Sequence, residues 1–435
     1  MLAVEIILLL GCIVLAARLG GIGVGLAGGL GLVIAVFILG IAPGDIPVAV
    51  ILIIMSVILA LSVMQKAGGM GYMVKVAENM LRNNPKYINI LAPATTFVLT
   101  TLAGTGYSAM SVLNVIQQVA KESGVRPSQP LSSAVVASQI AITASPISGA
   151  TAAMYVVVEQ MGVGFGSALA VIFPAALFGS IVAAFIASKQ GCDLKDDPIY
   201  LDRVKKGLVN FTPKEEKDIE PTAEAKRSVL IFMLGVVFIV AMLLFKPQLG
   251  HTLGSRDIIV ITMLFVSFLM AMTCKVKLTD IKKASIFADG AESLIVILGI
   301  VWLSSTIIGS HIPEIKEIAG TVLNDHPALL AVVFFGTSAL LFSQGATSAL
   351  LVPIAASLGV DAGTILASFV AVSALYITNI YPTTAFAIAT DDTGSFLSNK
   401  WNGSFLVNHP FFLPGFFGIV AAVPVGFFLA ELFIK

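Results

Sequence analysis

Long runs of apolar residues follow one another along the chain and are separated by short polar segments. A run of about 20 apolar residues is long enough to cross the hydrocarbon core of a bilayer as an α-helix. We therefore predict one membrane-spanning helix at each long run. These runs lie near residues 2–17, 22–41, 46–65, 163–188, 229–246, 257–274, 289–309 and 411–433.

Two regions, about 88–120 and about 327–358, depart from this pattern. In each, two apolar stretches that are short for a membrane span flank a tip rich in Gly, Ser and Thr. The first tip is residues 103–108 (AGTGYS) and the second is residues 343–348 (SQGATS). Stretches of this length suit the two arms of a re-entrant hairpin, so we predict one hairpin in each half of the chain.

Two more regions, about 130–160 and about 364–390, are long enough to span but are interrupted near the middle. The interruptions are residues 144–148 (ASPIS) and residues 378–383 (TNIYPT). Proline lacks an N–H group and its ring clashes with the preceding turn, so each region predicts a broken helix. Non-helical backbone at membrane depth persists only inside protein or beside a water-filled cavity. The duplicated pair of tip and break therefore predicts the substrate site of a secondary transporter.

The same features follow in the same order in both halves, which predicts an internal repeat. We expect a first repeat at 1–188, a polar linker at 189–228 and a second repeat at 229–435. The predicted fold is an all-α polytopic membrane protein with about five spanning helices and one re-entrant hairpin in each repeat. An odd number of crossings makes the two repeats inverted relative to each other.

The positions of Lys and Arg support this topology. If the linker is cytoplasmic, both termini face outside, and the inner segments hold all Lys and Arg residues except Lys246, Arg256, Lys316 and Lys435. This distribution agrees with the positive-inside rule. An alternative with twelve crossings, in which both hairpins span fully, also places the two termini on one side and stays open.

Composition sets the class of protein and excludes several functions. Of the 435 residues, 57% are hydrophobic and 11% are charged, whereas soluble proteins have about 25% charged residues. The three cysteines and four histidines show no metal-ligand spacing, and we predict no certain metal site and no cofactor. There is no Walker A motif, no hydrolase motif and no nucleic-acid-binding signature, so we predict neither an enzyme nor an ATP-driven pump.

The candidate substrate-binding residues lie at the tips and breaks. The second arm of each hairpin directs the N–H groups and the partial positive charge of a helix N-terminus towards the cavity, which suits a carboxylate. Two such tips suit a molecule with a carboxylate at each end; the structural alternative is that small residues only allow close helix packing. The candidates are Gly104, Thr105, Gly106, Tyr107, Ser108, Ser145, Pro146, Ser148, Gln344, Gly345, Thr347, Ser348, Thr378, Asn379, Tyr381 and Thr383.

No Lys or Arg lies inside an unbroken apolar run, and intramembrane charge is expensive. We therefore expect the substrate to be held without a deeply buried basic side chain. Freed carbonyl groups near Ser145 and Asn379 are candidate ligands of a coupling cation, Na⁺ or H⁺. Proline kinks capped by Ser or Thr are also common structural devices, so this interpretation stays open.

Several charged residues near the hairpins are candidates for gating or electrostatic roles. Glu78 and Arg82 have the spacing of a helical ion pair on an amphipathic stretch at about 70–84. Arg126 follows the first hairpin and is a candidate for attracting anions towards the inner vestibule. Asp391 and Asp392 follow the second broken helix and suit solvation, capping or proton coupling. For Glu78, Arg82 and Arg126 a structural or topological role is at least as strong an alternative, and the sequence does not decide among the three roles of the two aspartates.

Several longer motifs resemble one transporter family over essentially the full chain. They include RNNPKY at 82–87, QIAITASPIS at 139–148, DDPIY at 196–200, DDTG at 391–394 and NHPFF at 408–412. With these motifs the chain resembles the anaerobic C4-dicarboxylate transporter (Dcu) family.

The resemblance implies exchange of fumarate, malate or aspartate for succinate across a bacterial inner membrane. With the charge distribution given above, both termini are then expected to be periplasmic. It also implies kinship with transporters that move substrate by an elevator motion of a transport domain against a scaffold domain. We expect small dicarboxylates and lipid as partners and a homo-oligomer, with a dimer favoured. Two alternatives stay open: a dicarboxylate sensor that signals to a sensor kinase, and a passive anion channel.

Overall fold

The computed structural model describes residues 2–19, 22–209, 220–245, 253–311, 325–379, 381–397 and 409–434. These residues form helices and connecting loops, with no strand among them. The prediction of an all-helical, polytopic membrane protein is confirmed at this level. Part of the predicted linker (210–219), Ile380 of the second break and both terminal residues lie outside the described residues.

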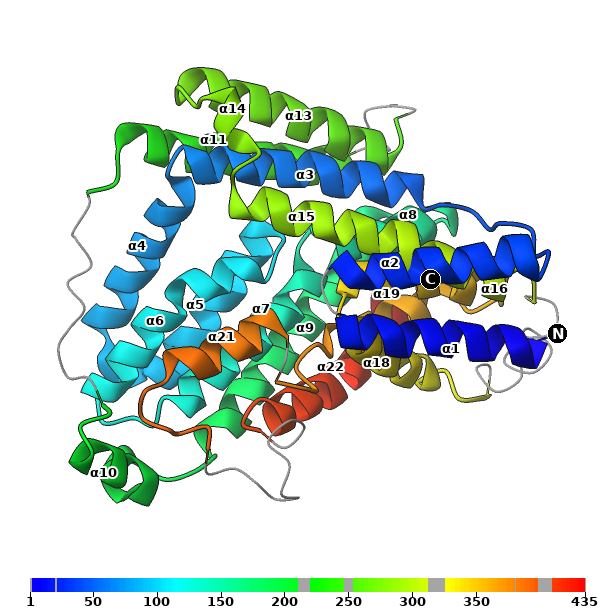
Figure 1. Ribbon diagram of the computed structural model, residues 1–435. Helices are drawn as coiled ribbons and strands as arrows, with labels where there is room; N and C mark the ends of the chain where they lie inside the picture. The colour runs from blue at the N-terminus through cyan, green and yellow to red at the C-terminus, as the bar shows by residue number, and fades with distance from the viewer. Residues whose placement is uncertain are drawn as a thin grey trace.

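The first half of the chain contains the elements labelled α1 to α9 in Figure 1. They are α1 (Leu2–Leu19), α2 (Ile22–Val33), α3 (Val48–Lys66), α4 (Gly69–Asn83), α5 (Ile88–Ala103), α6 (Tyr107–Glu122), α7 (Ser128–Ala144), α8 (Gly149–Gln160) and α9 (Phe165–Ser188). A π-helical turn, Ile34–Ile38, extends α2.

The second half begins after the short helix α10 (Pro198–Lys205) of the linker. It contains α11 (Ala223–Leu244), α13 (Ser255–Thr273), α14 (Leu278–Ile281), α15 (Ser285–Val296), α16 (Trp302–Gly309), α18 (Leu329–Leu341), α19 (Gln344–Ser357), α20 (Ala362–Ser368), α21 (Pro382–Thr390) and α22 (Phe412–Phe433). A π-helical turn, Ile297–Val301, joins α15 to α16, and a 3-10 helix, Phe369–Ser373, extends α20.

Seven segments of the described chain are long and apolar enough to cross a membrane. They are Val48–Lys66, Ser128–Gln160, Phe165–Ser188, Ala223–Leu244, Ser255–Thr273, Ser285–Gly309 and Phe412–Phe433. The helices at the first two predicted runs, and the first arm of the second hairpin, are apolar but shorter. The inverted orientation of the repeats and the domain boundaries stay predictions.

The backbone turns back at both predicted tips and is interrupted at both predicted breaks, whereas the re-entrant arrangement of the hairpins in the membrane stays a prediction. The pairs α5–α6 and α18–α19 form the hairpins, α7–α8 is the first broken helix, and α20 with its 3-10 extension and α21 form the second. The second arm of each hairpin packs against the broken helix of the other half, because α6 contacts α21 and α19 contacts α8. Figure 1 shows α21 beside α6 in this way.

Helices α2, α3, α11, α13 and α15 form a separate group that packs together beside these elements. Helix α3 packs against α13 and α15, and α2 packs against α15 and its π-helical turn. The approach of α2 to this turn is close enough to require glycine, since a Cβ atom on Gly299 would lie 1.9 Å from the carbonyl oxygen of Gly25. Small residues allow such backbone contact between membrane helices.

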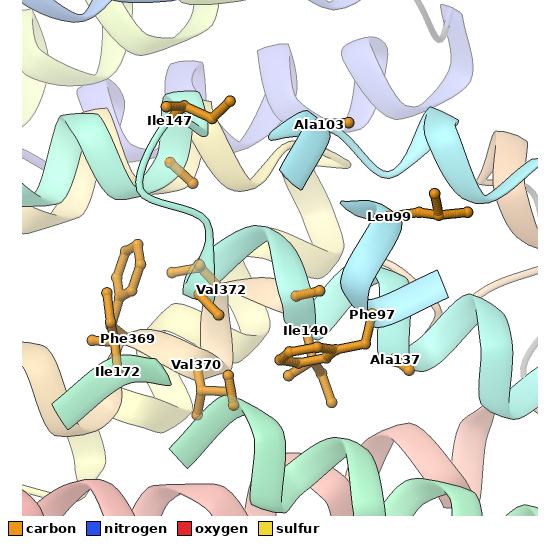
Figure 2. Packing of buried hydrophobic residues seen from close by; sticks show 14 of the residues in the cluster. Phe97, Leu99, Ala103, Ala137, Ile140, Ile147, Ile172, Phe369, Val370 and Val372 are labelled. Carbon is orange, nitrogen blue, oxygen red and sulfur yellow. The ribbon is translucent and has the colours of Figure 1, made fainter. Parts of the chain in front are cut away.

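The main hydrophobic core joins the two halves beneath the breaks. Figure 2 shows Phe97 of α5, Ile140 of α7 and Ile172 of α9 around Val370 and Val372 of the 3-10 helix. All five are at least nine-tenths buried. Helices α9 and α22, which are the last helices of the two halves, also pack along each other. The first hairpin and both broken helices therefore rest on one continuous core.

Candidate functional site

A cavity of about 320 Å³ lies where the two tips and the two breaks meet. The tips contribute residues 104–107 and 341–345 to its wall, and the broken helices contribute residues that include Ile147 and Tyr381. The rest of the wall comes from α2, α3 and α15. The volume lies at the lower end of the range for small-molecule sites, which suits a compact metabolite.

The first tip begins where Gly104 ends α5. Gly104 has a left-handed backbone (φ +69°), and its N–H group donates to the carbonyl oxygen of Thr100 over 2.8 Å. Glycine adopts this conformation without steric cost. Helix α6 starts at Tyr107, so its N-terminal end lies at the cavity wall. The side chain of Ser108 points away from the cavity and is buried, where its hydroxyl donates to the carbonyl oxygen of Thr105 over 2.8 Å.

The second tip has a similar turn with different residues. Phe342 ends α18 with a left-handed backbone (φ +50°), although it is not a glycine. Ser343 caps α19 by accepting a hydrogen bond from the N–H group of Ala346 at 3.1 Å. Gln344 and Gly345 are the first two residues of α19, and both line the cavity. The first N–H groups of a helix lack intrahelical partners, so this end suits an anion.

The two remaining tip candidates do not line the cavity. The hydroxyl of Thr347 donates to the carbonyl oxygen of Ser343 over 2.7 Å, and the hydroxyl of Ser348 donates to that of Gln344 over 2.8 Å. Both side chains are fully buried. Such bonds within a helix are common for Ser and Thr, and they direct both hydroxyls away from the cavity.

At the first break, the predicted residues Ser145, Pro146 and Ser148 do not line the cavity, and Ser148 forms hydrogen bonds with the backbone instead. Ser148 caps α8 by accepting a hydrogen bond from the N–H group of Thr151 at 3.1 Å, and its own hydroxyl donates to the carbonyl oxygen of Ile142 over 2.7 Å. Ser145 is fully buried, and neither it nor Pro146 belongs to the cavity wall. The wall here is formed by apolar residues and by Gly149.

At the second break, Tyr381 and Pro382 line the cavity, whereas Thr378, Asn379 and Thr383 do not. Tyr107 of the first tip and Tyr381 of the second break both line the wall, and their phenol groups interact with each other. The first tip and the second break, which belong to different halves of the chain, therefore meet at the cavity.

Two acidic residues of the wall were missed by the sequence analysis. Asp289 and Glu292 lie on α15, face the cavity and are partly buried. Both carboxylates interact electrostatically with the phenols of Tyr107 and Tyr381. The signal was an acidic pair inside an otherwise apolar helix, where ionisable residues usually have functional roles.

The predicted ion pair of Glu78 and Arg82 is confirmed. The Nε atom of Arg82 lies 2.8 Å from Oε1 of Glu78 on α4. Arg82 also donates to the side chain of Gln118 on α6 over 2.8 Å. The pair therefore fastens α4 to the first hairpin, and neither residue lines the cavity.

Arg126 lies in a buried ion pair rather than in an open vestibule. Its Nη1 atom lies 2.5 Å from Oδ2 of Asp197, and the two side chains are 3% and 1% exposed. Arg126 also donates to the carbonyl oxygen of Ser395 over 2.8 Å. Asp197 in turn caps α10 by accepting from the N–H group of Ile199 at 2.9 Å. These contacts favour the structural alternative for Arg126.

The two aspartates after the second broken helix have different partners. Asp391 accepts hydrogen bonds from the N–H and hydroxyl groups of Thr393 and Ser395, at 2.6–3.0 Å. Asp392 pairs with Lys121 of α6 at 2.9 Å and accepts a bond from Gln117 at 2.8 Å. Asp391 thus stabilises the loop that follows α21 by bonds within that loop, and Asp392 connects the same loop to the C-terminal end of α6.

The described residues contain no group of three or more His, Cys, Asp or Glu side chains that suits a metal ion. The predicted cation site near the two breaks would use a different set of ligands, namely oxygen atoms of the backbone and of Ser and Asn side chains. A coupling cation near Ser145 and Asn379 therefore stays a prediction.

Comparisons with known proteins agree with one another. A family model described as "Anaerobic c4-dicarboxylate membrane transporter" matches residues 1–434. The chain is 45% identical to the C4-dicarboxylate transporter DcuA of Wolinella succinogenes and 47% identical to that of Escherichia coli K12, over at least 99% of each chain. It is also 31% identical to the anaerobic C4-dicarboxylate transporter DcuB of an Escherichia coli O6:H1 strain, over 99% of this chain and 98% of the relative.

Proposed function

Because this chain belongs to the family of anaerobic C4-dicarboxylate membrane transporters, we propose that it exchanges four-carbon dicarboxylates by secondary transport. The proteins of this family are membrane transporters rather than enzymes. The proposed substrates are fumarate, malate and aspartate, which enter in exchange for succinate. Na⁺ or H⁺ is the proposed coupling ion where uptake is not balanced by exchange.

The observation that carries this proposal is the meeting of two helix N-termini at one cavity. Tyr107 begins α6, Gln344 begins α19, and both line the wall. Each N-terminus presents N–H groups and a partial positive charge, which stabilise a carboxylate. Two such ends at one cavity suit an acid that carries a carboxylate at each end. The carboxylates then meet main-chain N–H groups and the exposed parts of residues 104–107 and 343–345.

The composition of the wall supports binding without a basic side chain. No Lys or Arg is among the described residues that line the cavity. A permanent positive charge at membrane depth is costly when the site is empty. A helix N-terminus has no such net charge, so the empty and occupied sites can be closer in energy, which suits a carrier that must also release its substrate.

The proposed setting is a bacterial inner membrane, with both termini periplasmic and the 189–228 linker cytoplasmic. The distribution of Lys and Arg supports this orientation. The hairpins and broken helices would form the moving part of an elevator, and α1–α3 with α11–α15 the scaffold. A homodimer is the proposed assembly. Thiol labelling of single-cysteine variants in intact cells tests the orientation of the linker.

Counterflow in proteoliposomes tests the exchange. Liposomes loaded with succinate should take up labelled fumarate or aspartate faster than liposomes that contain no dicarboxylate. Equal uptake in both would contradict exchange. A passive channel would give flux that does not saturate with substrate and does not depend on internal acid. A protein that only senses dicarboxylates would bind them but show no saturable uptake in either preparation.

A further inference from the structure

Gln139 of α7 is a fully buried amide behind the cavity wall. It is not one of the residues that line the cavity. Its neighbours nevertheless belong to both tips and to the second broken helix. A buried amide needs partners for its donor and acceptor groups, and here those partners come from parts of the chain that surround the substrate site.

The first tip rests directly on this amide. A Cβ atom on Gly106 would lie 2.9 Å from Nε2 of Gln139. The amide nitrogen thus occupies the space beside the tip backbone that a side chain would need. Ser138, which precedes Gln139 on α7, adds a weak contact, because its hydroxyl donates to the carbonyl oxygen of Gly106 over 3.4 Å. The position of Gly106 relative to α7 is therefore set by the length of the Gln139 side chain.

The second tip is fastened to the same residue. Nε2 of Gln344 donates to the main-chain carbonyl oxygen of Gln139 over 2.8 Å and lies 3.4 Å from its Oε1 atom. A main-chain carbonyl only accepts hydrogen bonds, which fixes the orientation of the Gln344 amide. Because Gln344 is the first residue of α19, the bond places the N-terminus of that helix relative to α7.

The third contact reaches the second broken helix. Nε2 of Gln139 donates to Oγ1 of Thr383 over 3.1 Å, and Thr383 lies in the first turn of α21. Thr383 is 1% exposed. Gln139 thus contacts three different elements around the cavity: its side-chain amide meets Gly106 and Thr383, and its main-chain carbonyl oxygen accepts the bond from Gln344.

This bridge is not a product of the internal repeat. Ile142-Thr143 and Ile377-Thr378 occupy matching places before the two breaks, so the counterpart of Gln139 is Ala374. Ala374 is fully buried and has no polar side-chain group. The backbone pattern of tip and break therefore forms in the second half without such an amide, and the role of Gln139 is separate from forming the break.

We propose that Gln139 is a positioning residue that sets the separation of the two tips and so the chain length of the dicarboxylate that the cavity accepts. This inference rests on the proposed function. If each tip holds one carboxylate, the distance between the tips selects the number of carbons between them. One methylene group more or less changes discrimination by roughly 10- to 200-fold at a shaped site.

The test compares malonate, succinate and glutarate, which have three, four and five carbons, in proteoliposomes. Gln139→Asn shortens the side chain by one methylene, so the amide retreats from Gly106 and the first tip settles towards α7. The cavity should widen, and the ratio of kcat/KM for glutarate to that for succinate should rise about tenfold. Gln129→Asn is the matched control. Gln129 lies on the same helix and is also buried, but it bonds to Asn89 and Gln190. In Gln129→Asn the glutarate-to-succinate ratio of kcat/KM should therefore stay at the wild-type value.

A second variant, Thr383→Val, keeps the proposal testable even if Gln139→Asn does not fold. Thr383→Val removes one partner of the amide while keeping the volume, and it should raise the same ratio by a smaller factor. A ratio that stays at the wild-type value in folded Gln139→Asn overturns the proposal; if that variant does not fold, an unchanged ratio in Thr383→Val overturns it. A uniform fall of kcat/KM for all three acids also overturns it. If the wild-type protein transports none of these acids, the proposed function itself fails.

Discussion

Gly104 and Phe342 occupy equivalent places in the two hairpins and share a left-handed backbone conformation, with φ angles of +69° and +50°. Each ends the first arm, with its N–H group bonded to the carbonyl oxygen of Thr100 or Ser338. Glycine adopts this conformation without steric cost, whereas a bulky residue carries strain on the order of 1–3 kcal/mol. Both residues line the cavity. The second tip therefore stores strain beside the site, and the first does not.

Gly104→Ala should destabilise the protein and reduce exchange. The added Cβ would lie 3.1 Å from Cγ1 and 3.2 Å from the carbonyl oxygen of Ile147, and a left-handed alanine costs roughly 1–2 kcal/mol. We expect the unfolding temperature in detergent to fall by a few degrees. Gly336→Ala on α18, where a Cβ meets no atom within 4 Å, is the control and should be neutral or slightly stabilising. Equal unfolding temperatures for Gly104→Ala and wild type would contradict the strain argument.

Asp289→Asn and Glu292→Gln should each lower the apparent KM for succinate. Both carboxylates face the cavity, and like charges at short distance in a medium of low dielectric constant repel strongly. Removing one negative charge should therefore strengthen the binding of a dianion by several-fold. Ser293→Ala changes a neutral residue of the same wall and is the control. A higher KM or a loss of exchange in both acidic variants would show instead that these carboxylates assist transport.

Arg126→Gln should unfold the protein more easily without a salt-dependent change in substrate affinity. The substitution leaves the buried carboxylate of Asp197 without its cation, which costs about 3–5 kcal/mol. The double variant Arg126→Gln with Asp197→Asn should recover much of that loss. The exposed pair of Lys206 and Asp202 is the comparison, and Lys206→Gln should change the free energy of unfolding by at most about 1 kcal/mol.

A salt-dependent loss of substrate affinity in Arg126→Gln would instead support the role predicted from the sequence, in which Arg126 attracts anions towards the inner vestibule. If Arg126 attracts anions to the inner face, Arg126→Gln will weaken substrate binding more at low salt than at high salt, because mobile ions screen exposed charges. Measuring succinate affinity at two ionic strengths, together with the unfolding temperature, separates the two roles.

Stability should fall in acid because of His409. Burial lowers the pKa of this histidine from 6.5 to about 4, while its ring lies 3.2 Å from the carbonyl oxygen of Ile377. The unfolded chain therefore binds the proton more tightly than the folded one. The neutral histidine is favourable above pH 6.5, and this stability is lost as the pH falls from 6.5 towards 4, to the extent of about 3 kcal/mol at 1.4 kcal/mol per unit.

His409→Gln keeps an N–H donor for Ile377 and has no proton to gain. Its unfolding temperature should fall less than that of wild type between pH 7 and pH 4.5. His326→Gln, which changes an exposed histidine, is the control and should behave as wild type. Parallel pH curves for wild type and His409→Gln would contradict the assignment.

The hairpins and breaks were predictable because local residues specify them. Gly104 ends an arm through its backbone freedom, and Pro146 and Pro382 cannot continue a helix. These effects act within a few residues, so the sequence locates the non-helical backbone correctly. The two arms of each hairpin and the two parts of each broken helix accordingly lie where the apolar pattern predicts them.

The orientation of the polar side chains was not predictable in the same way. Ser108 and Thr347 were expected to face the ligand, but their hydroxyls bond to nearby carbonyl oxygens instead. Asp289 reaches the site from a segment far away in the chain, and Gln139, although it lies just before the first break, meets Gly106 and Gln344 only through tertiary packing. Their roles depend on which face of a buried helix meets the tips, and hydrophobic periodicity is weak in helices that are apolar on all sides.

The central claim is that a dicarboxylate binds between the two tips, and substrate protection of a single cysteine tests it most directly. The chain has only Cys12, Cys192 and Cys274, so a cysteine-free background is within reach. Gly345→Cys places a thiol in open space at the second tip, and Gly71→Cys does so on α4 away from the cavity. In variants that still exchange succinate, saturating succinate should slow thiol labelling of Gly345→Cys and leave that of Gly71→Cys unchanged. Labelling of Gly345→Cys at the same rate with and without succinate would contradict the account.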